Sequence, residues 1–254
     1  MLSKSISLSE KATFSLGKFL KNTVALTMAR GIDMAVMVII GGVVARYLGP
    51  QLYGEYAFII TLVIFLFSFT YFGTERILIR EIAKNKDKAD VAMGTALMAR
   101  WIIAAAVILI ILVSVFFFCL RWELKIAVFI TVVSQIALSS STLYGAAYQA
   151  FERMEYEAVL TFLSRLITLF CLVLVVKSNS GFVFIFVALA IGNIVGMLAS
   201  IMVTTKRFVK PRITFDFSLM KDLLKRSFIL GINMLIIQAL FRVDIFLLKA
   251  YKDN

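Results

Sequence analysis

About seven apolar stretches, each about 20 residues or longer, dominate the chain. A helix needs about 20 apolar residues to cross about 30 Å of hydrocarbon. Because a backbone amide in lipid finds no water to bond, helices are the expected spanning form. The sequence therefore predicts an all-α integral membrane protein with about seven transmembrane helices. These cover residues 22–46, 53–73, 91–120, 124–149, 158–177, 181–205 and 227–251.

The composition agrees with a membrane protein and excludes several other classes. Of the 254 residues, 61% are hydrophobic, and the mean hydropathy is +0.96. A net charge of +12 in a soluble protein would suggest nucleic-acid binding. Here most lysines and arginines lie between the apolar stretches, where the positive-inside rule explains them, so we expect no nucleic-acid partner. The chain has no histidine, and Cys119 and Cys171 lie in separate apolar stretches, so we expect no metal site or disulfide framework.

The distribution of basic residues predicts the orientation in the membrane. Lysine and arginine are frequent in the N-terminal tail and in the connections after the second and sixth stretches, and sparse on the other side. Cytoplasmic connections carry this excess, so the N-terminus is expected in the cytoplasm. Residues 216–226 alternate apolar and basic positions at helical spacing, which favours an amphipathic helix on the cytoplasmic leaflet.

The seventh stretch is weakly similar to the first. The runs that begin at Phe19 and Leu223 both start with a leucine–lysine pair and end near a tyrosine, which suggests an internal repeat. One interpretation is that six helices form a lobe and the chain continues one helix into a second, incomplete lobe; another is a truncated fragment that does not transport. The predicted organisation is a cytoplasmic tail (1–21), a six-helix transmembrane lobe (22–205), a cytoplasmic linker with an amphipathic helix (206–226) and a seventh transmembrane helix (227–254).

Five short runs carry a resemblance to a known family. They are ARYLGPQLYGEYAFI from Ala45, FGTERILIREIAK from Phe72, AAYQAFERMEY from Ala146, KRSFILG from Lys225 and FRVDIFLL from Phe241. Together they resemble the polysaccharide-lipid flippases that export O-antigen and capsule precursors, within the multidrug/oligosaccharidyl-lipid/polysaccharide exporter superfamily. The chain corresponds to the N-terminal half of such a protein.

The resemblance implies both a function and a location. It implies a flippase that moves an undecaprenyl-pyrophosphate-linked oligosaccharide from the inner to the outer leaflet of the bacterial cytoplasmic (inner) membrane. The implied mechanism is alternating access of two helical lobes around a cationic cavity. The implied partners are this lipid-linked oligosaccharide, membrane lipids, and the polymerase and other polysaccharide-assembly proteins.

Arg30 and Asp33 are two ionisable residues inside the first apolar stretch. An ionisable group near the bilayer centre costs about 2.5–3.5 kcal/mol on insertion scales, so it needs a partner or a water-filled cavity. Because they are spaced i and i+3, the two side chains share a helix face and can pair. They form either a self-satisfied pair, with Arg30 reaching toward the inner surface, or a binding site. In the binding site, Arg30 donates to a pyrophosphate and Asp33 holds its orientation.

Other charged residues inside the stretches are further candidates for substrate binding. Arg100 and Arg165 lie toward the predicted cytoplasmic side. They either extend to that surface or point inward with Arg30 to form a cationic funnel. Arg242 and Asp244 are two residues apart and lie on different helix faces, so they cannot simply neutralise each other. Arg242 is a substrate-binding candidate, and Asp244 is a candidate either for proton or sodium coupling or for an ion pair between lobes.

Two charged clusters flank the predicted inner surface. Their near-balanced charge fits salt-bridged, solvated helix ends, and the alternative is a cytoplasmic gate that engages the headgroup. The gate candidates are Glu75, Arg76, Arg80, Glu152 and Arg153.

Glycine and other small residues predict where the chain turns and where helices approach closely. Gly49 and Pro50 end the first stretch and should reverse the chain. Gly192 and Gly196 form a GxxxG pattern that favours close helix packing. Residues 139–141 and 145–147 give the fourth stretch a small-residue strip, which permits close packing or lines a sugar path.

The sequence predicts transport rather than catalysis. No serine, cysteine or lysine is accompanied by a recognisable base, and no glycine-rich phosphate loop occurs, so we expect no enzyme activity. We also expect no cofactor other than a proton or sodium ion for coupling. The alternatives are an ion-coupled exporter of the same superfamily and, with less support from the short outer connections, a membrane glycosyltransferase or polymerase.

Overall fold

The computed structural model describes residues 2–71, 73–117, 121–212, 220–221 and 225, with residues 2–26, 28–30 and 116–117 described by their backbone alone. The predicted seventh helix (227–251) and most of the predicted amphipathic helix (216–226) lie outside the described residues.

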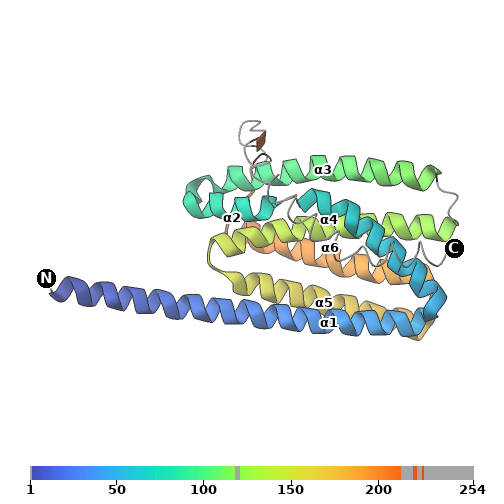
Figure 1. Cartoon of the computed structure of the whole chain (residues 1–254), viewed down its shortest axis with the longest axis horizontal. Helices are drawn as coiled ribbons and strands as arrows, with labels where there is room; N and C mark the ends of the chain where they lie inside the picture. The colour runs from blue at the N-terminus through green and yellow to red at the C-terminus, as the bar shows by residue number, and fades with distance from the viewer. Residues whose placement is uncertain (1, 72, 118–120, 213–219, 222–224, 226–254) are drawn as a thin grey trace, which may run out of the picture.

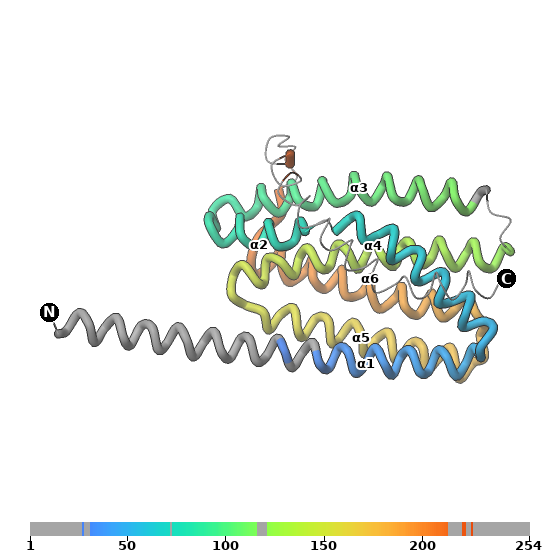
Figure 2. Tube along the Cα trace, in the orientation of Figure 1, coloured from blue at the N-terminus to red at the C-terminus, as the bar shows by residue number. Residues whose placement is uncertain are grey.

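Helix α1 (Leu2–Tyr71) contains a chain reversal that separates the first two predicted spans. Gly49 has φ 68° and ψ 176°, a left-handed backbone conformation that glycine adopts without steric cost. Pro50 follows with no amide hydrogen to continue the helix. The backbone trace turns back on itself there, so α1 consists of a first arm up to residue 48 and a second arm from residue 50 (Figure 2). This confirms the predicted turn.

The second connection holds the short helix α2 (Thr74–Lys84) and the 3₁₀ turn η1 (Lys86–Lys88). Gly73, with φ 68°, has a left-handed backbone conformation that interrupts the helix between α1 and α2. Helix α2 is part of the core of the bundle. Leu78 and Ile82 are fully buried in one apolar cluster with Met93 of α3 and Leu143 of α4.

The remaining helices match the predicted spans to within about one helical turn. They are α3 (Ala89–Phe117), α4 (Trp122–Ala150), α5 (Met154–Ser178) and α6 (Phe182–Arg207). Among the described residues, five helical segments are long and apolar enough to cross a membrane. The first of them, Gly31–Lys84, includes the reversal at Gly49 and therefore covers residues 31–46 of the first predicted span and all of the second. The protein is an all-α membrane protein, as expected.

The helices run back and forth along one long axis (Figure 1). The α2–α3 connection, the α4–α5 turn and the end of α6 lie at one end, and the reversal in α1 and the α5–α6 turn lie at the other. The first arm of α1 packs on α5 and α6 through Val36, Ile40 and Val44. The second arm packs on α3 and α4 through Val63 and Phe67. The inner connections predicted from charge therefore share one end of the bundle.

Helices α5 and α6 approach to backbone contact at the predicted GxxxG pattern. A Cβ atom added to Gly192 would lie 1.8 Å from Thr168 Oγ1, and one added to Gly196 would lie 2.8 Å from Ser164 Oγ. Ser164 Oγ donates a hydrogen bond of 2.7 Å to the Gly192 carbonyl. This confirms that the glycines serve close helix packing.

Candidate functional site

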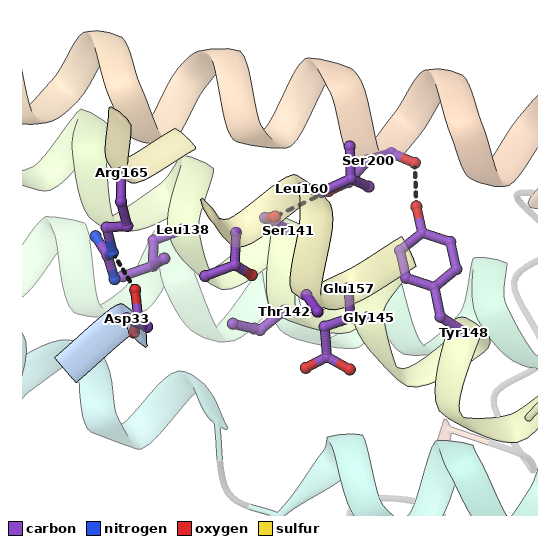
Figure 3. Close-up of a pocket in the computed structure, with 12 residues that line it drawn as sticks. Asp33, Leu138, Ser141, Thr142, Gly145, Tyr148, Glu157, Leu160, Arg165 and Ser200 are labelled. Carbon is purple, nitrogen blue, oxygen red and sulfur yellow. Dashed lines mark hydrogen bonds and ion pairs between the residues drawn. The ribbon is translucent and has the colours of Figure 1, made fainter. Parts of the chain in front are cut away.

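A cavity of about 280 Å³ lies among α1, α4, α5 and α6 (Figure 3). The cavity stands out in a largely apolar bundle because eight of the twelve residues that line it have polar side chains. Polar groups inside a membrane bundle are costly unless they meet partners, water or a ligand. The residues that line it are Asp33, Leu138, Ser141, Thr142, Gly145, Tyr148, Glu157, Ala158, Leu160, Thr161, Arg165 and Ser200.

The polar lining follows from two stripes at helical spacing. On α5, Glu157, Thr161 and Arg165 are spaced i, i+4 and i+8, so they lie on one face of the helix. On α4, the polar face runs along residues 141–148 and includes part of the predicted small-residue strip. Since both stripes line the same cavity, that part of the strip lies on a polar surface between helices.

An ion pair between α1 and α5 lies at one end of the cavity. Arg165 Nε donates to Asp33 Oδ1 at 2.8 Å, and the two side chains are 16% and 32% exposed, respectively. Arg165 therefore points into the cavity, where it pairs with Asp33. The described partner of Asp33 comes from a helix 132 residues away in the chain. The side chain of Arg30 lies outside the described residues.

Glu157 and a set of hydroxyl groups form the other end of the cavity. Gln149 Nε2 donates to Glu157 Oε2 at 2.9 Å, which fixes the carboxylate from the end of α4. The carboxylate lies against Gly145, where an added Cβ would be 3.4 Å from Glu157 Cδ (Figure 3). Nearby, Tyr148 donates to the Ser200 carbonyl at 2.9 Å. The Ser141 and Ser200 hydroxyls are 3.0 Å apart.

The charge of the described lining differs from the cationic cavity that the resemblance implied. The lining contains two carboxylates, Asp33 and Glu157, and one guanidinium, Arg165. Asp33 pairs with Arg165 in this conformation, and Glu157 accepts a hydrogen bond from Gln149. The described part of the cavity therefore carries charges of both signs.

Arg100 lies outside the cavity, in the wall behind it. It is fully buried, so neither extension to the surface nor a position in a cationic funnel is correct. Its Nη1 donates to the Ser139 carbonyl and, at 3.1 Å, to Thr142 Oγ1. Its Nη2 donates to Thr74 Oγ1 at 2.8 Å, and the guanidinium lies 5.3 Å from the centre of the Tyr71 ring. Arg100 thus joins α2 and α4, and it contacts the cavity only through Thr142.

Four of the five predicted gate residues are exposed, at the end of the bundle that is predicted to face the cytoplasm. Arg76 and Arg80 are exposed on α2, Glu75 is half-buried, and Glu152 and Arg153 are exposed in the α4–α5 turn. Arg153 pairs with Glu155 of its own turn at 3.3 Å. A gate formed by these residues stays a prediction. Arg242 and Asp244 lie outside the described residues.

An aromatic cluster closes the bundle next to the hydroxyl end of the cavity. Phe208, just after α6, has its ring centre 5.3 Å from the rings of Tyr148 and Tyr156 and 5.6 Å from that of Phe151. The sequence reasoning did not single out this cluster or the cavity role of Glu157. The i, i+4, i+8 spacing of polar residues on α5 could have indicated that Glu157 shares a helix face with Arg165. No spacing pattern indicates the aromatic cluster, because its members come from separate segments of the chain.

Comparison with family models gives one match, to a family described as polysaccharide biosynthesis protein, and it spans residues 19–254. Comparisons with curated proteins and with solved structures gave no match.

Proposed function

Because this chain belongs to the family of polysaccharide biosynthesis proteins, we propose that it acts in moving a lipid-linked oligosaccharide across the bacterial cytoplasmic membrane. The cargo is an undecaprenyl-pyrophosphate-linked oligosaccharide, carried from the inner to the outer leaflet for a surface polysaccharide such as O-antigen or capsule. The N-terminus faces the cytoplasm, and the cavity becomes accessible from each side in turn.

The observation that carries the proposal is the polar cavity inside an apolar bundle. Its lining includes hydroxyl groups from α4, α5 and α6, together with charged groups from α1 and α5. The headgroup of the cargo is a polar saccharide joined to phosphates, and it needs such a surface to cross the hydrocarbon region. Burying these hydroxyl and charged groups among apolar helices costs free energy, so their presence is easiest to explain if they contact a polar ligand or water.

Arg165 is the described residue best suited to bind a phosphate of the headgroup. A guanidinium offers forked N–H donors that match phosphate oxygens. In the present conformation Asp33 occupies this donor at 2.8 Å. A phosphate would compete with the carboxylate for the guanidinium, so Asp33 acts as an internal substitute for the cargo.

The test is a flipping assay with the full chain in proteoliposomes that contain an undecaprenyl-pyrophosphate-linked oligosaccharide. A membrane-impermeant lectin reports the fraction of saccharide that reaches the outer leaflet. We expect movement above that in protein-free liposomes. Arg165→Gln should reduce the rate about 10-fold or more, because a charge-assisted hydrogen bond contributes about 1.5–3 kcal/mol. Arg121→Gln, at an exposed arginine before α4 that has no predicted role in the site, is the matched control and should leave the rate unchanged. No movement above protein-free liposomes refutes the proposal.

A second candidate is an ion-coupled exporter of the same superfamily. The observation in its favour is that carboxylates outnumber guanidinium groups two to one in the described lining, which suits a cationic cargo or a coupling cation. Proteoliposomes with a proton or sodium gradient and a cationic dye separate the two functions. Gradient-driven dye movement, without movement of the lipid-linked saccharide, would favour the exporter.

A further inference from the structure

Two basic side chains lie on the aromatic cluster, at the end of the bundle predicted to face the cytoplasm. The Arg207 guanidinium is 5.6 Å from the centre of the Tyr156 ring, and Lys86 Nζ is 5.6 Å from the centre of the Phe151 ring. We propose that Arg207 and Lys86 form a docking site for the pyrophosphate of the lipid-linked cargo, which binds there before the headgroup enters the cavity. This inference rests on the proposed function and adds a second binding site for the same cargo.

The ring contacts position these two cations without neutralising them. A ring face attracts a cation through its quadrupole but carries no net charge. Arg207 Nη1 also donates to the Tyr156 hydroxyl at 2.7 Å, which leaves its other N–H groups for an anion. Both side chains are exposed, and neither forms an ion pair with any residue that the structure describes. Because Asp33 occupies Arg165 in this conformation, an approaching phosphate meets Arg207 and Lys86 as the unpaired cations of the two sites.

The depth of the two residues matches that of lipid phosphates. Helix α6 has 26 residues and ends at Arg207, so at about 1.5 Å per residue it is about 39 Å long. The hydrocarbon core is about 30 Å thick, and the bilayer with its headgroups is about 40–45 Å thick. If α6 begins at the outer edge of the hydrocarbon, Arg207 lies in the inner headgroup layer. Lys86 precedes α3, which has 29 residues and reaches at least as far. The cargo's pyrophosphate lies in this layer before it is moved.

The aromatic cluster connects the docking site to the cavity. Tyr148 lines one end of the cavity (Figure 3). Its ring centre is 5.3 Å from that of Phe208 and 6.0 Å from that of Tyr156. Phe208 follows Arg207 directly in the chain, and Tyr156 carries the Arg207 guanidinium on its ring. A pyrophosphate bound at Arg207 therefore holds the attached saccharide beside the hydroxyl end of the cavity.

The experiment measures lipid binding to the full chain in detergent micelles by native mass spectrometry. The probe is undecaprenyl pyrophosphate, and the comparison lipids are undecaprenol, which lacks phosphate, and phosphatidylglycerol, an ordinary anionic lipid. We expect the unmodified protein to bind the probe at least about 10-fold more tightly than either comparison lipid. Arg207→Gln and Lys86→Gln should each weaken probe binding about 3- to 5-fold, and the double variant about 10-fold or more, because each removes one exposed charge contact.

The matched controls are Lys206→Gln and Lys88→Gln. Both lysines are exposed close neighbours of the docking residues in the chain, and the described structure shows no ring contact for either. These controls remove the same amount of charge, so they should weaken probe binding less than about twofold. All four positions are exposed, so the variants should unfold at the same detergent composition as the unmodified protein, which separates lost binding from lost structure.

The outcomes separate this inference from the proposed function. Unweakened probe binding in the double variant, or equal weakening in the controls, overturns the docking site. Equally tight binding of phosphatidylglycerol at the same two residues assigns the surface to bulk lipid and overturns its role for the cargo. If the lectin assay shows flipping while these substitutions leave binding unchanged, only this inference fails. If the probe binds at Arg207 and Lys86 but no saccharide is flipped, the proposed function fails.

Discussion

Replacing Arg100 tests whether hydrogen-bond geometry, rather than charge, is what stabilises the wall behind the cavity. The guanidinium is 0% exposed and donates to Ser139, Thr142 and Thr74 from both of its terminal nitrogens. Lysine keeps the charge but concentrates its donors at one point, so it cannot reach acceptors on α2 and α4 together. Methionine removes the charge and keeps a similar length.

The expected order of stability follows from these contacts. Arg100→Lys loses at least one charge-assisted hydrogen bond, about 1.5–3 kcal/mol, and leaves a buried charge that is poorly compensated. Arg100→Met loses all three hydrogen bonds but no longer buries a charge, and these effects largely offset each other. The hydroxyls left behind still donate elsewhere, Thr74 to the Tyr71 carbonyl at 2.9 Å and Thr142 to the Ser139 carbonyl at 2.9 Å. We therefore expect the charge-conserving variant to be the less stable one.

The measurement is the free energy of unfolding in mixed micelles of dodecyl maltoside and sodium dodecyl sulfate. Arg100→Lys should lower it by about 2–4 kcal/mol, and Arg100→Met by about 0–2 kcal/mol. The matched control is Arg121→Lys, because Arg121 pairs with Glu55 at 2.5 Å but is 60% exposed, and such pairs contribute about 0–1 kcal/mol. If Arg100→Lys is as stable as the unmodified protein, or more stable than Arg100→Met, the hydrogen-bond account is refuted.

Two further substitutions test the helix contacts around the cavity. Gly192→Ala should destabilise the protein by about 1–3 kcal/mol in the same unfolding assay, because its Cβ would collide with Thr168. The control is Gly42→Ala, whose Cβ has no atom within 4 Å and which should be neutral or slightly stabilising. Equal effects of the two substitutions would contradict the packing argument. Asp33→Asn should free Arg165 and raise the affinity for undecaprenyl pyrophosphate about fivefold, since it removes a competing ion pair of about 1 kcal/mol. Native mass spectrometry reads this affinity, and weaker binding would mean that Asp33 positions Arg165 instead of competing for it.

The sequence predicts the helices of the described lobe well because lipid imposes a length and an apolar composition on each span. The reversal at Gly49 and the α5–α6 contact at Gly192 also follow from local patterns, since only particular residues permit a left-handed backbone or backbone contact. These features depend on neighbours in the chain. They can therefore be inferred without knowledge of the tertiary arrangement.

The partners of the charged residues could not be predicted in the same way. Spacing on one helix shows which face a residue occupies, but not which helix packs against that face. Asp33 therefore suggested a partner on its own helix, whereas its described partner is Arg165 on α5. The sequence suggested that Arg100 reaches the membrane surface or a cavity. Its burial could not be foreseen, because the acceptors that make it possible, the Ser139 carbonyl and Thr74 Oγ1, come from other helices. The cavity could not be predicted for the same reason, because its lining comes from four helices whose packing the sequence does not show directly.

The close contact between α5 and α6 restricts the path of the proposed lipid-linked cargo. At Gly192 the Thr168 side chain leaves no space for even a methyl group, and the Ser164 hydroxyl donates a hydrogen bond to the Gly192 carbonyl. A polyprenyl chain is several ångströms wide and cannot pass through this seam. If the headgroup crosses within the cavity, its tail must slide along another seam. The seam between α1 and α5 holds the Asp33–Arg165 pair, which the proposed phosphate would displace, so we expect the lipid tail to follow this seam during the crossing.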